Sequence, residues 1–475
     1  MPTRIEFGTD GWRAIIAEEF TFDNVRYCAQ AVADWLRQEG KASDGLVVGY
    51  DTRFASDRFA MAVAEVAAAN EVPVYLCNRP EPTPVASYSV LDRKAGGGVV
   101  ITSSHNPAAY NGFKVKGSYA GSASPEIVAI LHERIEALQA QGGVERMPFE
   151  EAVAKGRVEM IDARPPYFAQ MGRLVDLERL RASGLRILHD PLYGTGIGYY
   201  DALLGGGTAT VSSIHDVINP NFPGIHAPEP IPPNVNALLA AVRDAHADLG
   251  LATDGDSDRV GLVDEQGTFI NQLEVYALLL WYLLEVRGLR GPAVRSLTST
   301  SMADRLGQRY GIDVIETMVG FKYVGQEMIE RDAILGGEES GGYGFRGHIP
   351  ERDAILAGLY LLDLRVQKNQ PLSAIVRELH EIAGASYYDR HDARFAADQR
   401  DAIIARVKAA HPAEIAGLAV VRIDDKEGRK FYLEDGSWLL IRFSGTEPLL
   451  RIYTETTSRE RVERILAAGH QITGV

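Results

Sequence analysis

The sequence predicts an α/β protein of several units, followed by a smaller α+β unit at the C-terminal end. Through most of the chain, short apolar runs typical of buried strands alternate with longer segments of helical periodicity. The last hundred residues are richer in strands. A chain of 475 residues accommodates about three or four domains of ordinary size.

Residues 1–150 are predicted to form the first α/β unit. A helix is expected from Thr21 or Asp23 to Gly40, because apolar residues at helical spacing lie between a capping residue and a glycine. An alanine-rich helix follows at 58–70. A polar stretch near residues 140–156 marks the expected boundary. Strands are predicted at 46–50, 72–76 and 97–102.

Two further α/β units are predicted at 151–253 and 254–368. The second contains a helix at 234–246 and strands at 186–189, 210–214 and 248–252. The third contains strands at 260–263, 293–297, 313–315 and 333–335. Its apolar run at 275–284 is too short to cross a bilayer and is predicted to be a buried helix.

The last predicted unit, 369–475, has α+β character. A helix is expected from Ser458, and a hinge near residues 368–385 is expected to let this unit move. Its strands are predicted at 419–423, 430–433, 438–442 and 450–453.

Composition excludes several classes of partner. The net charge of −15 argues against binding to nucleic acid or to an anionic membrane. Two cysteines, Cys28 and Cys77, cannot form a disulfide framework, and the first residues lack an apolar signal region. A reduced, cytoplasmic enzyme is therefore expected.

The segment Thr102-Ser-Ser-His-Asn-Pro107 is the most informative feature of the chain. It follows a predicted strand, and the carboxyl ends of strands are where open α/β sheets bind ligands. A serine there can act as a nucleophile if it is activated, although a serine in a turn is commonly only a turn residue.

An acidic loop, Asp254-Gly-Asp-Ser-Asp258, follows a later strand. Three alternating carboxylates repel one another without a cation, and Mg²⁺ prefers oxygen ligands. One alternative is a solvated acidic turn. Another is an EF-hand, since Glu265 occupies loop position 12; however, Arg259 stands where that loop needs glycine, and strands rather than helices are predicted on both sides.

Two further loops carry groups suited to a phosphorylated sugar. Glu338 and Ser340 offer acceptors two residues apart, which suit paired hydroxyls, although Glu338 by itself could be an exposed charge. Arg442 offers a bidentate fork for phosphate. The turn after it adds two hydroxyl donors and a glycine that lets backbone N–H groups approach an anion: Ser444, Gly445 and Thr446.

These four segments, in this order and spacing, resemble those of the α-D-phosphohexomutases, the phosphoglucomutase/phosphomannomutase family. The resemblance extends over essentially the whole chain. It implies three similar doubly wound α/β domains and a distinct C-terminal domain, arranged around one central cleft.

The resemblance also implies roles for individual residues. Ser104, which directly precedes His-Asn-Pro, would carry a phosphoryl group and, with Asp254, Asp256 and Asp258, would bind Mg²⁺. Active-site and substrate-binding roles are implied for Arg13, Lys114, Arg259, Lys322, Glu338, Ser340, Arg442, Ser444, Gly445, Thr446 and Arg451. His105 would orient the phosphate or serve as a turn residue. Residues Gly49–Arg53 would give structural support.

This chain departs from the family pattern at Gly342, where several members have a histidine considered for acid/base catalysis. That role therefore has no counterpart at position 342. Lys114 or His348 could substitute, and only Lys114 has support from a motif.

The implied activity is interconversion of glucose 1-phosphate and glucose 6-phosphate, with glucose 1,6-bisphosphate as intermediate and activator. Phosphomannomutase activity and glucose 1,6-bisphosphate synthesis are the alternatives; a phosphatase and a non-catalytic sugar-phosphate binder are more distant ones. The expected partners are small hexose phosphates, and the expected assembly is a monomer or a small homo-oligomer.

Overall fold

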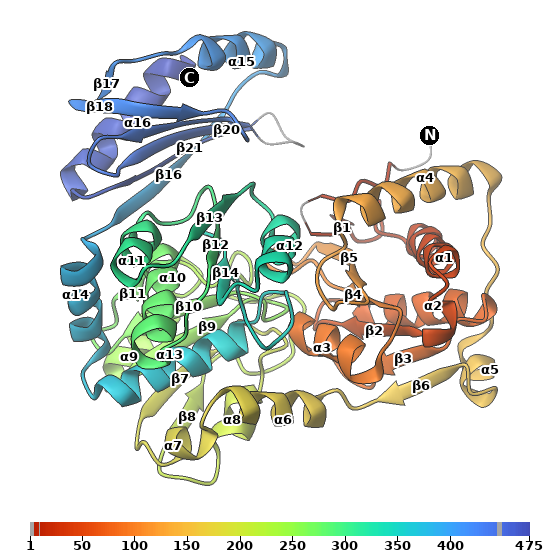
Figure 1. The fold of residues 1–475 in the computed structure, drawn as a ribbon. Helices are drawn as coiled ribbons and strands as arrows, with labels where there is room; N and C mark the ends of the chain where they lie inside the picture. Colours follow the sequence, from red (N-terminus) through yellow and green to blue (C-terminus); the bar gives the residue numbers. More distant parts are fainter. Residues whose placement is uncertain (1–3, 9, 444–448) are drawn as a thin grey trace.

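The computed structural model describes residues 4–8, 10–443 and 449–475. Four sheets follow one another along the chain (Figure 1). Three of them mix parallel and antiparallel strands and are accompanied by helices, whereas the fourth is entirely antiparallel. The predicted combination of three α/β units and a different C-terminal unit is therefore confirmed.

The first sheet has the order β1-β5-β4-β2-β3-β6. Its strands are β1 (Trp12–Ile15), β2 (Leu46–Tyr50), β3 (Val74–Cys77), β4 (Gly97–Ile101), β5 (Tyr110–Gly117) and β6 (Val158–Ile161). The helices are α1 (Phe22–Gln38), α2 (Ser56–Ala69), α3 (Thr83–Arg93), α4 (Pro125–Gln141) and α5 (Phe149–Ala154). Helix α1 begins at the predicted cap, because the Thr21 side chain accepts a hydrogen bond from the Asn24 N–H.

Helices cover both faces of this sheet, as its strands require. All five residues of β2 are buried. Leu46 and Val48 belong to the core that contains α1 and α2, whereas Val47 packs in a separate core with Val90 of α3. Since alternate residues of a strand point to opposite faces, β2 is covered on both.

The second sheet has the order β11-β10-β9-β7-β8. Its strands are β7 (Arg186–Asp190), β8 (Thr210–Ser213), β9 (Leu249–Thr253), β10 (Val260–Asp264) and β11 (Phe269–Ile270). The accompanying helices are α6 (Arg164–Leu174), α7 (Leu177–Arg181), α8 (Tyr199–Leu204) and α9 (Asn236–Asp244).

The third sheet has the order β13-β12-β14-β15. Its strands are β12 (Ala293–Ser296), β13 (Val314–Thr317), β14 (Leu335–Gly337) and β15 (Tyr343–Phe345). The accompanying helices are α10 (Gln272–Trp281), α11 (Met302–Tyr310), α12 (Phe321–Arg331) and α13 (Ala354–Lys368). Helix α10 is buried as predicted, and a π-helical turn, Tyr282–Val286, continues it.

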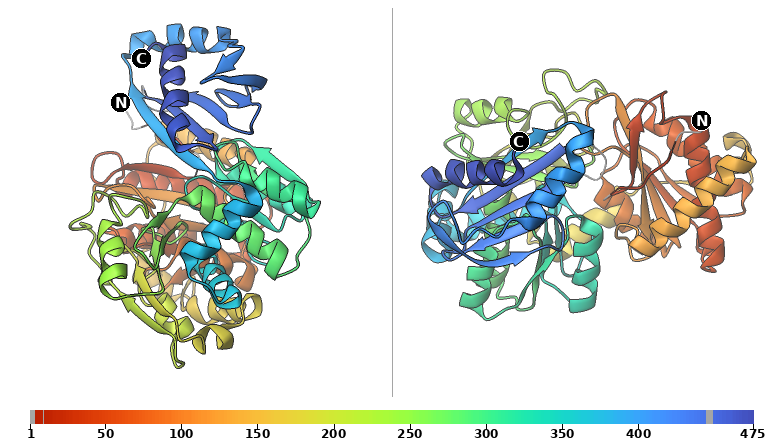
Figure 2. Two further views of the ribbon diagram at one scale, coloured as in Figure 1. Left: turned by 90° about the vertical axis from the view of Figure 1, so that its left-hand side faces the viewer. Right: turned by 90° about the horizontal axis from the view of Figure 1, so that it is seen from above.

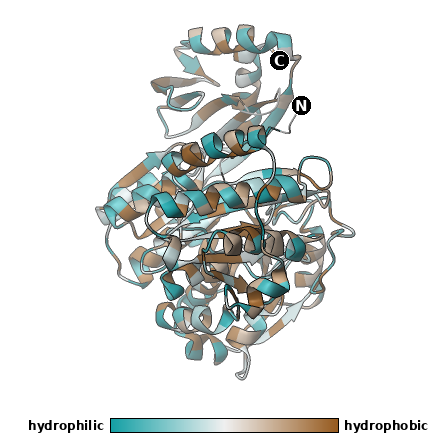
Figure 3. Cartoon of the chain, turned by 90° about the vertical axis from the view of Figure 1, so that its right-hand side faces the viewer, coloured by the Kyte–Doolittle hydropathy of each residue, from teal (hydrophilic) through white to brown (hydrophobic). Residues whose placement is uncertain are grey.

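The second and third units share one continuous hydrophobic core, to which α10 and α13 contribute most of their residues. The first and C-terminal units have their own main cores. Figure 3 shows hydrophilic and hydrophobic residues mixed along the outer helices, as expected for helices with one buried side. Among the described residues, no helix combines the length and apolarity needed to cross a membrane.

The C-terminal sheet has the order β16-β21-β20-β19-β18-β17. Its strands are β16 (Tyr387–Arg394), β17 (Glu414–Ile415), β18 (Leu418–Asp424), β19 (Arg429–Leu433), β20 (Trp438–Phe443) and β21 (Leu449–Thr456). The helices α15 (Arg400–Ala409) and α16 (Arg459–Thr473) accompany it, and α14 (Leu372–Ala383) occupies the predicted hinge region. In Figure 1 and in the left view of Figure 2 this unit stands above the third one.

The predicted chemical segments occupy equivalent places in the four units. Each lies between two antiparallel neighbours: β4 and β5, β9 and β10, β14 and β15, and β20 and β21. The first three follow a strand that also pairs in parallel with another strand. Each α/β unit therefore presents its chemical loop from a hairpin in a mixed sheet, at the end of a strand that also has a parallel neighbour.

The sheets extend across two of the predicted domain limits. Strand β6 lies beyond residue 150 but pairs with β3 in the first sheet. Strand β10, predicted to begin the third unit, pairs with β9 in the second, because the six intervening residues return the chain directly alongside β9. The sequence analysis predicts no counterpart of β1, β5, β6, β11, β15, β16 or β17. Cys28 and Cys77 are buried free thiols, and the cytoplasmic location stays a prediction.

Candidate active site

Ser104 lies at the centre of the site. It is buried, and its Oγ donates a hydrogen bond of 2.6 Å to Asp254 Oδ2 in the acidic loop. Its φ angle is +52°, a left-handed conformation that is uncommon for residues other than glycine. Such a conformation persists only where surrounding contacts hold it in place.

Arg53 supplies those contacts. Its guanidinium is fully buried, and its Nε lies 3.2 Å from Asp51 Oδ2. Its terminal nitrogens donate to four backbone carbonyls around the serine, those of Ser104, Asn106, Pro107 and Tyr110. The Gly49–Arg53 segment thus supports the Ser104 loop.

The acidic loop contacts the Ser104 loop backbone to backbone. A Cβ atom added at Gly255 would lie 2.5 Å from the carbonyl oxygen of Ser104, so glycine is needed for this approach. Asp254, Asp256 and Asp258 are all buried, and each offers a carboxylate oxygen within 4.8 Å of the others. Strands flank the loop and Glu265 hydrogen-bonds Ser373, so the EF-hand hypothesis is wrong.

The three carboxylates fit a hard divalent cation. The Oδ1 atoms of Asp256 and Asp258 are buried and have no hydrogen-bond partner among the described residues, so both remain available as ligands. Burial and the charges of its two neighbours raise the pKa of Asp254 well above its usual range. A bound cation would offset that repulsion, and oxygen donors of this kind suit Mg²⁺.

Lys114, from β5, neutralises part of the negative charge of the acidic loop. Its Nζ is buried and lies within 2.9 Å of carboxylate oxygens of Asp10, Asp256 and Asp258. These carboxylates outweigh the effect of burial and raise the pKa of Lys114. Lys114 is therefore held as an ammonium ion and contributes fixed positive charge.

His105 and Arg13 lie beside Ser104. His105 Nδ1 is 3.4 Å from Ser104 Oγ and 3.5 Å from Arg13 NH1, and Arg13 also donates to Asn106 at 2.7 Å. Burial and several nearby cations hold the pKa of His105 well below its usual range. Because Arg13 is always a donor, Nδ1 is placed to act as an acceptor.

Arg352 joins three of the site's segments and was missed by the sequence analysis. Its buried guanidinium contacts Asp10 near the N-terminus, Asp258 at 2.8 Å and Glu338 at 3.5 Å. These carboxylates, together with Glu351, raise its pKa. The signal available in the sequence was a run of three charged residues at 351–353, directly before an apolar helix.

Arg352 also accounts for the glycine at position 342. A Cβ atom built on Gly342 would overlap the aliphatic part of the Arg352 side chain. The space that a histidine would occupy here is thus filled by arginine. His348 does not take its place, because it is buried against Asp353, at 2.9 Å, and stacked on Tyr88.

The sugar-loop candidates lie on the other side of Arg352. Glu338 is buried, and burial raises its pKa. Its Oε1 accepts a hydrogen bond of 2.8 Å from the Gly320 N–H, at the start of the helix that carries Lys322. Ser340 is half-buried. The structure thus brings Glu338 and the Gly320–Lys322 segment together.

Two other residues support the acidic loop. Thr83, also missed, begins α3, and its Oγ1 donates to Asp256 Oδ2 at 2.6 Å. Arg259 is mostly buried, and its guanidinium lies 3.8 Å from Asp258 and 3.7 Å from Glu229. The acidic loop is therefore held from the first unit as well as from its own.

The C-terminal candidates are only partly described. Arg442 and Arg451 face each other across β20 and β21. Arg442 pairs with Glu427 at 2.5 Å, and Arg451 lies 3.9 Å from Asp392. Ser444, Gly445 and Thr446 lie outside the described residues.

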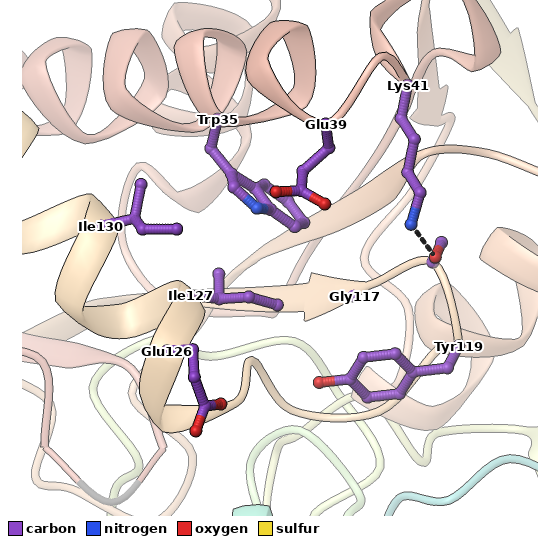
Figure 4. Close-up of a pocket in the computed structure, with 9 residues that line it drawn as sticks. Trp35, Glu39, Lys41, Gly117, Tyr119, Glu126, Ile127 and Ile130 are labelled. Carbon is purple, nitrogen blue, oxygen red and sulfur yellow. Dashed lines mark hydrogen bonds between the residues drawn. The ribbon is translucent and has the colours of Figure 1, made fainter.

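Two other features lie apart from this site. A pocket of about 210 Å³ between α1, α4 and the loop after β5 contains none of the predicted residues (Figure 4). Its lining includes Trp35, Lys41 and Tyr119. A second group of possible metal ligands, Asp389, His391 and Glu463, is on the C-terminal unit, and its two carboxylate residues are exposed.

The chain is similar to known proteins over almost its whole length. Four models described as phosphoglucomutase/phosphomannomutase match: domains I, II and III at 4–142, 165–267 and 272–382, and the C-terminal domain at 400–468. A Thermococcus kodakarensis protein named phosphoglucomutase/phosphomannomutase is 30% identical over 98% of this chain and 97% of its own.

Two further relatives also match this chain over almost its full length. A Methanothermobacter thermautotrophicus protein named probable phosphoglucosamine mutase is 30% identical over 97% of this chain and 95% of its own. A crystal structure from Thermus thermophilus, described as a candidate phosphomannomutase, superposes with a TM-score of 0.87 at 34% identity and covers both chains completely.

We expect Gly255→Ala to destabilise the protein by about 1–3 kcal/mol, as other overpacked sites do. The added methyl group would meet the Ser104 carbonyl, which Arg53 also holds. Denaturant unfolding would measure the change. Gly172→Ala is the control, because the nearest atom to a Cβ at that position lies 3.8 Å away. An equal loss in both variants would contradict the tight approach at Gly255.

We expect Arg352→Met to lower the free energy of unfolding by about 3–5 kcal/mol, because it leaves buried carboxylates without their partner. Arg331→Met, which breaks an exposed pair with Glu327, should leave the stability almost unchanged, because exposed ion pairs contribute little. Denaturant unfolding of both variants checks this. Equal stability of the two variants would show that Arg352 does not neutralise the buried group.

Proposed function

Because the chain belongs to the phosphoglucomutase/phosphomannomutase family, we propose that it interconverts glucose 1-phosphate and glucose 6-phosphate. The reaction would pass through phosphorylated Ser104 and glucose 1,6-bisphosphate. The observation that carries the proposal is the buried contact of 2.6 Å between Ser104 Oγ and Asp254 in the carboxylate cluster. A phosphoryl group on that oxygen would lie next to the candidate cation ligands.

In the proposed reaction, the bond from phosphorus to Ser104 Oγ breaks while the free hydroxyl of the sugar forms a new P–O bond, and the proton of that hydroxyl passes, overall, to Ser104 Oγ. The resulting bisphosphate turns over in the site and returns its other phosphoryl group to Ser104. Phosphoryl transfer depends chiefly on in-line positioning and on charge neutralisation. The left-handed backbone of Ser104 and the Arg53 contacts supply the positioning.

Asp254, Asp256 and Asp258 would hold Mg²⁺, which when bound neutralises negative charge on the transferring group. Lys114 adds positive charge that does not depend on a metal, because three carboxylates keep it protonated. Arg259, at the end of the same loop, would face the phosphorylated end of the sugar.

The remaining candidates would bind the sugar in both orientations. Glu338 and Ser340 would accept hydrogen bonds from the hydroxyl groups of the sugar, and Lys322 would reach the substrate from the neighbouring helix. Arg442 and Arg451, together with Ser444, Gly445 and Thr446, would hold whichever phosphate is not reacting. Uncatalysed cleavage of phosphate monoesters is extremely slow, so such neutralisation is needed at both ends.

Two other sugars call for a direct comparison with glucose. Mannose phosphates differ at position 2, and relatives of similar identity are named phosphoglucomutase/phosphomannomutase and phosphoglucosamine mutase. If the protein released the intermediate, it would instead be a glucose 1,6-bisphosphate synthase. In that case glucose 1,6-bisphosphate would accumulate when a separate phosphoryl donor is supplied.

We expect purified protein with Mg²⁺ and trace glucose 1,6-bisphosphate to convert glucose 1-phosphate faster than mannose 1-phosphate or glucosamine 1-phosphate. A coupled assay measures each rate. Ser104→Ala should lower kcat at least about 10³-fold, because the group that accepts the phosphoryl is removed. Ser103→Ala is the matched control, since Ser103 is also buried but its Oγ has no partner in the described structure.

A faster reaction with another sugar would replace glucose in this proposal. Equal activity of Ser104→Ala and the wild type would exclude the phosphoserine route. Release of inorganic phosphate from every monophosphate, without isomerisation, would indicate a phosphatase instead.

We expect chelation with EDTA to lower the activity at least about 100-fold and added Mg²⁺ to restore it, because the carboxylate cluster would regain its cation. The Asp256→Asn variant should not regain activity when Mg²⁺ is added. Glu265→Gln, which lies outside the cluster, should regain it. Full activity in EDTA would contradict a catalytic role for a metal at these carboxylates.

A further inference from the structure

The side chain of Glu427 bridges the C-terminal unit and the third unit. Its Oε1 lies 2.5 Å from Nε of Arg442, and its Oε2 accepts a hydrogen bond of 2.7 Å from the backbone N–H of Val319. Val319 lies directly before Gly320, at the start of the helix that carries Lys322. One carboxylate therefore holds a candidate phosphate-binding arginine against a candidate substrate-binding loop.

The hairpin turn between β18 and β19 fixes Glu427 in this position. Gly428 has a φ of +81°, and a side chain there would overlap the backbone of Ile441 and Arg442. The turn thus lies directly on β20, beside Arg442. Asp425, in the same turn, pairs instead with Arg429 at 2.8 Å.

The contact with Glu427 uses the Nε–H of the arginine rather than its terminal N–H groups, although the Tyr453 side chain also interacts with the guanidinium. The two terminal nitrogens can still present a fork of donors to a phosphate. The Arg442 side chain is 14% exposed, so it is mostly fixed but still reachable. Holding a long side chain in its binding rotamer removes part of the entropy lost when a ligand binds.

The same loop also anchors the sugar-binding candidate. The N–H of Val319 donates to Glu427, and the next N–H, of Gly320, donates to Glu338 at 2.8 Å. Lys322 lies within the field of this group: burial lowers its pKa, while the carboxylates of Asp10 and Glu427 oppose the shift. Two successive amides thus set the separation between the Arg442 and Glu338 sites.

We propose that Glu427 is a positioning residue, which orients Arg442 for the phosphate that is not reacting and fixes the C-terminal unit at the correct distance from the sugar loop. This inference rests on the proposed phosphohexomutase function. The negative charge of Glu427 also repels a bound phosphate, and this effect acts against binding. Removal of Glu427 would therefore strengthen binding if repulsion dominated and weaken it if positioning dominated.

The test compares Glu427→Gln with the wild type in the mutase assay. The amide side chain of this variant cannot accept both hydrogen bonds, because one of its ends is a donor. We expect KM for glucose 1-phosphate to rise about 10-fold, while kcat changes less than about 3-fold, because the non-reacting phosphate is bound equally in the ground and transition states. Asp425→Asn, with the same charge change in the same turn, should leave KM within about 2-fold.

A double mutant separates positioning from a general structural effect. If Glu427 acts through Arg442, then Glu427→Gln should have little further effect on KM in an Arg442→Gln background. Fully additive effects would overturn the proposal, and so would an unchanged or lower KM in Glu427→Gln alone.

A separate result would contradict the proposed function itself: the wild type would turn over no hexose monophosphate. Calorimetric titration with glucose 6-phosphate then gives the Glu427 result directly: a Kd about 10-fold weaker in Glu427→Gln supports it, and an equal or tighter Kd overturns it. Absence of binding to the wild type would overturn both.

Discussion

The structure depends on the mutual neutralisation of charges buried where its units meet. Asp10, Asp256 and Asp258 surround Lys114, and Arg352 connects two of these carboxylates, Asp10 and Asp258, to Glu338. Isolated charges are costly to bury, so these side chains are tolerated only because their partners, several of them from other units, lie within contact distance. The site therefore forms only when the α/β units are correctly assembled.

A repeated hairpin makes that assembly possible. Each α/β unit ends its parallel strands with a turn into an antiparallel neighbour, and the residues of that turn carry the chemistry. The strand behind each turn is buried, which fixes the loop that leaves it. A common scaffold can thus present a serine, a carboxylate cluster and the candidate sugar-binding loop, although these three loops differ in sequence.

The C-terminal unit is joined to this assembly through polar contacts that differ from those of the central cluster. Lys430 and Tyr432 bind Glu316, and Glu455 binds Thr300 and Ser301. A small apolar group that includes Leu297 and Trp438 packs beside them. Such a largely polar interface is typical of units that move relative to each other, and the proposed turning of a bisphosphate within the site would need such movement.

The sequence by itself determined the order of the units, most of the strands and the loops that carry the chemistry, because these depend on local periodicity and on motifs of adjacent residues. Ser104, Asp254, Asp256, Asp258 and Glu338 were found in this way. Only the tertiary structure decided which strands share a sheet: β6 and β10 lie beyond the predicted limits, because pairing depends on where the chain returns. The same holds for Arg352, Thr83 and Glu427, whose partners are distant in sequence and whose importance therefore arises only from folding.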